Sequence, residues 1–210
     1  IAIVGPSGAG KSTIIDFIPR LIIPSVGNVK INNNNIINYE INSLRSNISY
    51  LPQYPQMLEG TLAEHIRYGN ENISDQNIKD ALVKAGCENL LKKHQYNINI
   101  NIGSNGAMLS GGEKQRIDLA RALARKSLIL ILDEPSANLD SITEEIIKNA
   151  IENERKQRNL TVIVIGHRLN WFSRFTKIIV VKEGIIEAIG NHDIVLKKSS
   201  WYKKALENNK

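Results

Sequence analysis

At 210 residues the chain is long enough for one domain with a subdomain and for a sizeable buried core. Its 42% apolar and 23% charged residues are typical of a globular protein, and its apolar runs are too short to cross a bilayer. The net charge of +6 is scattered and only 5% of residues are aromatic, which disfavours a nucleic-acid surface, while the single Cys87 excludes an intrachain disulfide and a cysteine metal cluster.

The first predicted elements are a buried strand, a glycine-rich loop and a helix. Residues 1–4 form a short apolar run, and isoleucines at helical spacing follow the loop. The loop has the form G-x-x-x-x-G-K-[ST] and reads Gly5-Pro6-Ser7-Gly8-Ala9-Gly10-Lys11-Ser12-Thr13. Glycines let backbone N–H groups approach phosphate oxygens, Lys11 adds a charge at the β- and γ-phosphates, and the Ser12 hydroxyl can ligate Mg²⁺. The pattern predicts nucleotide binding rather than a glycine-rich turn with a surface lysine.

Residues 20–53 are predicted to hold short strands. Residues 29–31 and 36–37 are strand candidates on either side of an asparagine turn at 32–35. Residues 48–51 form another candidate strand, which leads directly into Pro52 and Gln53. This part of the chain therefore continues the β portion of the fold.

Residues 54–125 are predicted to form a helical subdomain. Thr61 with Glu64 is a capping box that opens a helix ending near residue 67. Ser74 caps a second helix with Ile78, Leu82 and Val83 on one face, and a third helix includes residues 90–91. Residues 97–102 alternate asparagine and isoleucine, but glycines follow, which favours an extended loop.

Helices and buried strands alternate in the remainder of the chain. Ser110 with Glu113 is a capping box that opens a helix to about residue 125, and Ser141 with Glu144 opens another to about residue 156. The predicted strands are residues 128–132, residues 160–165 and a hairpin over 178–189, and a helical tail begins at residue 191. This alternation predicts an α/β fold with a mostly parallel sheet.

Polar residues follow several of these strands. In parallel sheets the ligand lies beyond the carboxyl ends of the strands, so Lys11, Gln53, Asp133 and His167 are each expected to face one nucleotide. Asp133 could hold Mg²⁺ and adjacent Glu134 could polarise the attacking water. His167 could hydrogen-bond the γ-phosphate, and Gln53 could be a ligand of the metal or of water. Taken singly, these residues would be a solvated carboxylate pair, a loop histidine and a surface amide.

The segment Leu109-Ser110-Gly111-Gly112-Glu113 is a second candidate anion site. Two glycines in a first helical turn cost about 1 kcal/mol each in helix propensity, which is unusual for a purely structural cap. The cost is explained if backbone N–H groups must approach an anion. One nucleotide rarely needs two such helix ends from one chain, so two chains could each lend one.

Together these motifs resemble the ATP-binding-cassette ATPases, and the exporter type in particular. The resemblance covers essentially the whole chain. The matching motifs, in chain order, are residues 5–13, Gln53, residues 109–117, residues 128–134, residues 136–140 and His167. The resemblance implies one domain over residues 1–210, with a P-loop NTPase α/β core at 1–53 and 126–210, an antiparallel β portion truncated at its N-terminus, and an inserted helical subdomain at 54–125.

The resemblance also implies a function and a set of partners. Two cassettes would pair head to tail, with ATP and Mg²⁺ held between the phosphate loop of one chain and Ser110, Gly111, Gly112 and Glu113 of the other. Glu134 would be the general base, His167 the γ-phosphate sensor, and Gln53, with Ser12 and Asp133, a magnesium ligand linked to the transport domain. The ATPase would drive N-terminally fused transmembrane domains from the cytoplasmic face of a bacterial inner or plasma membrane.

Three expectations accompany that assignment. The chain begins inside a strand, so we expect it to be a piece of a longer protein, with the adenine-stacking aromatic residue upstream of Ile1. No nucleic-acid partner is expected. The alternatives are a soluble cassette ATPase that acts on DNA or ribosomes, which the positive charge would suit, and a nucleotide switch that does not hydrolyse ATP.

Overall fold

The computed structural model describes residues 1–135, 140–166 and 169–207. The chain forms two compact units. The first unit comprises Ile1–Ile48, Ile131–Glu134 and Thr161–Lys210, and the second comprises Ser49–Leu130 and Pro135–Leu160. The partition into core and helical subdomain expected from the sequence stays a prediction.

The main sheet has six strands. Their order across the sheet is β4 (Ile48–Leu51), β5 (Ile129–Asp133), β6 (Thr161–Ile165), β1 (Ala2–Val4), β7 (Ile178–Lys182) and β8 (Ile185–Gly190). In the first unit, β1 pairs in parallel with both β6 and β7, and β8 pairs antiparallel with β7. All three residues of β1 are buried, as expected for a strand covered on both faces. The predicted mixed α/β fold with a mostly parallel sheet is confirmed.

A two-stranded antiparallel sheet follows α1 (Lys11–Asp16) in the first unit. It pairs β2 (Lys30–Ile31) with β3 (Asn34–Asn35). The strand predicted at 36–37 is wrong, because Asn32 and Asn33 both take positive φ and close a two-residue hairpin loop. The pairing is therefore complete at Asn35, which caps a 3₁₀ turn over Ile36–Asn38 instead. The short helix α2 spans Ile41–Ser46.

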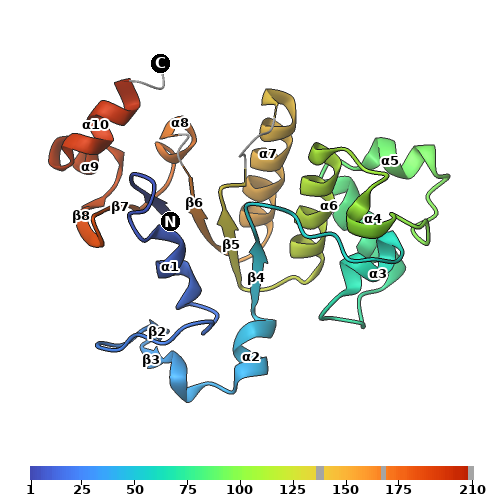
Figure 1. Ribbon diagram of the computed structural model, residues 1–210, viewed down its shortest axis with the longest axis horizontal. Coiled ribbons are helices and arrows are strands. Elements are labelled where there is room, and N and C mark those ends of the chain that lie inside the picture. Colours follow the sequence, from blue (N-terminus) through green and yellow to red (C-terminus); the bar gives the residue numbers. More distant parts are fainter. Residues whose placement is uncertain (136–139, 167–168, 208–210) are drawn as a thin grey trace. The chain divides into compact units, whose positions relative to one another are not determined.

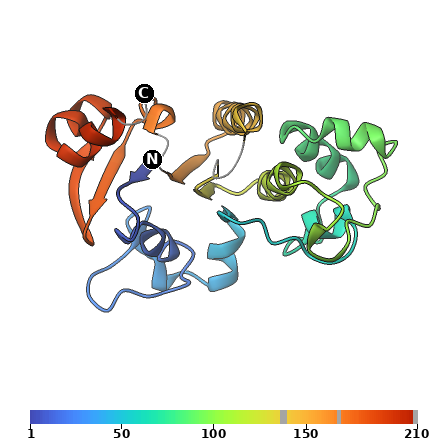
Figure 2. The same cartoon turned by 45° about the horizontal axis from the view of Figure 1, so that its top comes forward.

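The second unit is mainly helical. Its helices are α3 (Leu62–Arg67), α4 (Asp75–Lys84), α5 (Glu88–Lys93), α6 (Gly111–Ala124) and α7 (Ser141–Gln157), with a 3₁₀ turn at Ser104–Gly106. Figure 2 shows α3, α4, α5 and α6 gathered into one group, in agreement with the contacts of α6 with α3 and α4. The capping boxes at Thr61 and Ser110 and the cap at Ser74 are confirmed.

Three local expectations in the second unit are wrong. Val83 is 45% exposed, so it does not share the buried face of α4 with Ile78 and Leu82. Leu128 is 60% exposed and precedes β5 rather than joining it. The cap of α7 is Asp140, whose carboxylate accepts from the Thr143 N–H at 2.9 Å, and Ser141 is the first helical residue. Asp and Ser are both good N-caps, so adjacent candidates are not separated by pattern alone.

Three short helices lie within the described residues of the C-terminal part of the first unit. They are α8 (Leu169–Phe172), α9 (His192–Lys198) and α10 (Ser200–Glu207). Figure 1 shows α9 and α10 beside the β7–β8 hairpin, and α9 contacts both strands of that hairpin. Across the described residues, no helix combines the length and the hydropathy needed to span a bilayer. Cys87 is buried and forms no disulfide.

Candidate functional site

The predicted phosphate loop connects the buried strand β1 to the helix α1 in the first unit. Gly5 lies so close to β7 that a Cβ atom there would be 2.0 Å from the Val181 carbonyl oxygen. Gly10 is the N-cap of α1 with φ of +93°, a left-handed conformation that glycine adopts without strain. The loop is therefore held against the sheet at its start and turned sharply into the helix at its end.

The Gly5→Ala variant should lose at least about 3 kcal/mol of unfolding free energy, because the clash is with backbone and the sheet would have to shift. A matched control is Gly184→Ala at the β7–β8 turn, where φ is +75° but no described heavy atom beyond its neighbours lies within 4 Å. The control should lose only about 1 kcal/mol from backbone strain. Chemical denaturation of both variants measures the difference, and equal losses would contradict the steric argument.

Lys11 folds back onto the loop that carries it. Its Nζ donates to the carbonyl oxygens of Gly5 at 3.0 Å and Pro6 at 2.8 Å, and only 6% of the residue is exposed. Burial lowers the pKa of the Lys11 ammonium, while the carboxylates of Glu134 and Asp133 act in the opposite direction. The structure therefore brings the loop lysine and the acidic pair at the end of β5 into one electrostatic site.

The acidic pair lies at the end of β5, as the sequence predicts. Asp133 is the last residue of β5 and is buried, whereas Glu134 is partly exposed. Glu134 has φ of +47°, which is uncommon for a residue with a side chain, and its N–H donates to the Ile165 carbonyl at 2.9 Å. Such conformations cost about 1 kcal/mol or more and are concentrated at functional sites. The end of β6 thus fixes the backbone from which the Glu134 side chain projects.

The donor set at this site is compatible with Mg²⁺ bound together with phosphate. Ser12 offers an exposed hydroxyl and Asp133 a buried carboxylate, both hard oxygen ligands. Among the described residues, no group of three or more His, Cys, Asp or Glu could hold a metal ion. Phosphate oxygens would therefore have to complete the coordination, as is usual for magnesium at nucleotide sites.

The other predicted phosphate contact lies in the second unit. Ser110 Oγ accepts from the Glu113 N–H at 3.3 Å, and the Glu113 carboxylate accepts from the Ser110 N–H at 2.8 Å. That N–H lowers the pKa of the Glu113 carboxyl. Gly111 is exposed, and no described heavy atom outside its own turn lies within 4 Å of a Cβ built there. The first turn of α6 is thus capped by its own side chains and open on its outer side.

The structure also shows a link between α6 and α7 that the sequence analysis missed. Arg116 donates to Thr143 Oγ1 at 3.0 Å, and Thr143 in turn donates to Asp140 Oδ2 at 2.8 Å. A Cβ at Gly112 would lie 3.4 Å from the Arg116 guanidinium and 3.6 Å from Thr143 Oγ1. Gly112 therefore leaves room for this contact. No pattern in the sequence joins residues so far apart.

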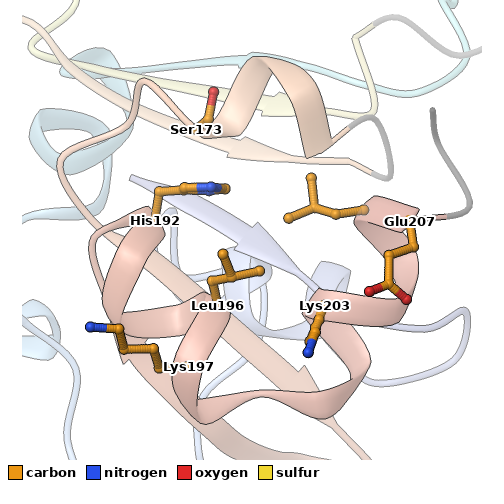
Figure 3. Close-up of a pocket in the computed structure, with 7 residues that line it drawn as sticks. Ser173, His192, Leu196, Lys197, Lys203 and Glu207 are labelled. Carbon is orange, nitrogen blue, oxygen red and sulfur yellow. The ribbon is translucent and has the colours of Figure 1, made fainter.

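The places of two further site residues, Gln53 and His167, stay predictions. Gln53 belongs to the second unit, and His167 lies outside the described residues. A pocket of about 720 Å³ lies at the C-terminal helices of the first unit (Figure 3), and none of the predicted site residues that the structure describes lines it. Its lining residues are Ser173, His192, Leu196, Lys197, Lys203, Leu206 and Glu207.

A buried β-strand, a glycine-rich loop, a buried lysine and an acidic pair at the end of another strand of the same sheet define a P-loop protein of the mixed α/β class. The chain belongs to the ABC transporter family, whose model matches residues 1–137. The resemblance stated from the motifs is therefore confirmed.

Individual relatives are transporters and exporters. ABC transporter B family member 14 of Arabidopsis thaliana is 35% identical over 205 residues, which cover 97% of this chain and 16% of that protein. The ATP-dependent lipid A-core flippase of Neisseria meningitidis is 34% identical over 202 residues, which cover 96% of this chain and 32% of that protein. A solved bacterial Atm1-family ABC exporter with ATP bound has a TM-score of 0.90 at 31% identity, covering 99% of this chain and 36% of that one. The chain thus spans a third or less of these curated relatives.

Proposed function

We propose that this chain is the ATP-binding and ATP-hydrolysing part of an exporter-type ABC transporter. The observation that carries the proposal is the convergence of buried Lys11 with Asp133 and Glu134 at a phosphate loop. The names of the relatives supply the transport context, since they include a flippase and an exporter. None of the relatives named above favours the alternative of a soluble ATPase acting on DNA or ribosomes.

The residues have separate tasks in this reaction. Loop N–H groups and Lys11 bind the phosphates. Ser12 and Asp133 would hold Mg²⁺, which would supply positive charge to offset the charge that develops on the phosphate oxygens. Glu134 accepts a proton from water as the water oxygen attacks the γ-phosphorus, and the bond to the ADP oxygen breaks. Gln53 is assigned to the metal and His167 to the γ-phosphate, as the resemblance to ATP-binding-cassette ATPases implies.

A second cassette completes the site in this proposal. The open first turn of α6 offers N–H groups and a positive helix end to the γ-phosphate of a partner's ATP. Transmembrane domains, fused N-terminally, would occupy part of the length by which the relatives exceed this chain. ATP-driven closure of the paired cassettes would then drive those domains from the cytoplasmic face of a membrane.

A mixing experiment with full-length protein tests the shared site. The Lys11→Ala variant lacks the loop cation, and Gly111→Glu places a carboxylate at the α6 turn, where the open space tolerates it and helix ends favour it. Each variant alone should release almost no phosphate from ATP in Mg²⁺. An equal mixture should recover about a quarter of the wild-type rate, because half of the dimers are mixed and each has one intact site.

Two controls accompany the mixture. Gly111→Ala should retain activity, and EDTA should reduce every sample to background. Mixing without any recovery would mean that two copies of this chain do not share a site. Full activity of Gly111→Glu alone would remove the α6 turn from the reaction.

A further inference from the structure

A chain of hydrogen bonds inside the second unit joins α6 to the first turn of α7. The Arg116 guanidinium on α6 donates to Thr143 Oγ1 at 3.0 Å. Thr143 Oγ1 donates in turn to Asp140 Oδ2 at 2.8 Å, and the Thr143 N–H donates to Asp140 Oδ1 at 2.9 Å. Thr143 is only 4% exposed, so water competes little for its hydroxyl. That hydroxyl both accepts and donates, which fixes its orientation.

The Arg116 side chain has further neighbours besides Thr143. Its stem passes the turn between α4 and α5, where a Cβ atom at Gly86 would lie 3.4 Å from Arg116 Cδ. The Ser110 N–H lowers the pKa of the Glu113 carboxyl, and the Arg116 guanidinium acts in the same direction. Burial raises the pKa of the Cys87 thiol to about 12, and Arg116 acts against this shift. One guanidinium thus serves the cap of α6, the α4–α5 turn and α7.

The two glycines of the α6 turn have different surroundings. A Cβ atom built at Gly111 would meet no described heavy atom outside its own turn within 4 Å. A Cβ atom built at Gly112 would lie 3.4 Å from Arg116 Nη1 and 3.6 Å from Thr143 Oγ1. Gly111 therefore leaves the turn open to a ligand, whereas Gly112 leaves room for the link to α7.

We propose that Arg116 is a positioning residue that holds the Ser110 turn against α7 before nucleotide arrives. A helix N-terminus binds phosphate through N–H groups that must already point at the ligand. The two glycines loosen this turn, because glycine has more backbone freedom than any other residue. The capping box satisfies N–H groups within the turn but does not join it to another helix. The charge-assisted bond from Arg116 to Thr143 supplies that connection.

The inference deepens the proposed function, on which its effect on turnover rests. In that function the Ser110 turn serves the ATP held by the phosphate loop of a second chain. Arg116 therefore acts on the site of the partner and not on the loop of its own chain. The hydrogen bonds of the link exist without nucleotide and can be measured without it, so the two ideas can fail separately.

Hydrogen–deuterium exchange on full-length protein without nucleotide tests the link, read in the peptide that contains the Glu113 amide. Thr143→Val keeps the shape of the side chain but lacks the hydroxyl, whereas Thr143→Ser keeps the hydroxyl. Exchange at Glu113 should rise about tenfold in Thr143→Val and in Arg116→Met, and should stay within about threefold of wild type in Thr143→Ser. The double variant should exchange no faster than the faster single one, since both substitutions remove the same bond.

A mixing experiment shows in which site the function is lost. Arg116→Met should hydrolyse ATP about tenfold more slowly than wild type, while its ATP affinity by isothermal titration stays within about twofold. An equal mixture with inactive Lys11→Ala should reach about a quarter of the wild-type rate, because each mixed dimer joins one intact loop to one intact turn. A general loss of structure would not be repaired by a partner that cannot hydrolyse ATP. Arg155→Met, at an exposed arginine of α7, should behave as wild type in both experiments.

The outcomes separate the link, its role and the proposed function. Equal exchange in Thr143→Val and Thr143→Ser would show that the hydroxyl does not hold the turn and would overturn the inference. A mixture no faster than the mean of its two components would remove Arg116 from a role in the partner's site. If Arg116→Met fails to fold, Thr143→Val replaces it in both experiments. The expected exchange pattern in a wild-type protein that releases no phosphate from ATP would instead count against the proposed function.

Discussion

The Glu134→Gln variant is expected to bind ATP with nearly wild-type affinity and to release phosphate at least about a hundredfold more slowly. The amide is close in size to the carboxylate but cannot accept the proton of the attacking water. Because binding is retained while turnover stops, ATP-bound dimers should accumulate. Size-exclusion chromatography of full-length protein with ATP and Mg²⁺ would detect them.

The structure indicates that this substitution changes the side-chain chemistry and leaves the backbone in place. Glu134 is held by its backbone, through the N–H that donates to Ile165 at 2.9 Å, so exchanging the side-chain oxygen for nitrogen leaves the strand ends in place. The left-handed φ of +47° is also retained, because glutamine bears the same Cβ as glutamate. The loss of rate can therefore be assigned to the lost base rather than to a displaced loop.

A matched control is Glu183→Gln. Glu183 is an exposed glutamate of the same unit with φ of +52°. The control therefore makes the same chemical change in the same backbone conformation, at a position distant in sequence. It should hydrolyse ATP at the wild-type rate. Undiminished hydrolysis by Glu134→Gln would remove Glu134 from the role of base, and a similar loss in both variants would point to a general effect of charge.

Local chemistry explains which elements the sequence predicted well. The capping boxes at Thr61 and Ser110 satisfy helix-end N–H groups within four residues, so their signal needs no distant partner. The strand–loop–helix around Lys11 is similarly local. The sequence also predicts the extended loop over residues 97–102, whose backbone carbonyls accept from N–H groups at the start of α3.

Competition between neighbouring signals explains the errors. The isoleucines at 36–37 have high β propensity, but the hairpin loop chosen by Asn32 and Asn33 completes the pairing before them. At the start of α7, Asp140 and Ser141 are both acceptable N-caps. The structure uses Asp140, which accepts from the Thr143 N–H, and Thr143 also accepts from Arg116 on α6. These outcomes depend on partners that a short window does not contain.

The same distinction between local signals and distant partners applies to the side chains that carry function or lie buried. Lys11, Asp133 and Glu134 could be assigned to one site from strand ends, because parallel strands place their carboxyl ends at one edge of a sheet. The contact between His65 and Asp118 cannot be predicted in this way, because the two residues are far apart in sequence and no motif relates them. Buried pairs between distant helices require the packed structure.

The Lys11→Ala variant is expected to bind ATP at least about a hundredfold more weakly, which corresponds to about 2.7 kcal/mol. The ammonium is already desolvated at the loop, with its pKa lowered by burial and countered by Glu134 and Asp133. Its attraction to phosphate therefore requires little further loss of hydration. Without it, the two carboxylates would repel the nucleotide with no loop cation to oppose them.

Isothermal titration with ATP measures this loss, and two comparisons separate binding from folding. Lys11→Ala also leaves the Gly5 and Pro6 carbonyls without their lysine donor, so its thermal midpoint without nucleotide should fall slightly. Lys11→Met retains most of the buried aliphatic stem and should lose ATP affinity to the same extent, whereas Lys182→Ala, at an exposed lysine on β7, should bind as wild type. Since both Lys11 variants lack the charge and only one keeps the packing, equal affinity losses would identify the charge as the cause. Unchanged ATP affinity in either one would contradict a phosphate site built on this loop.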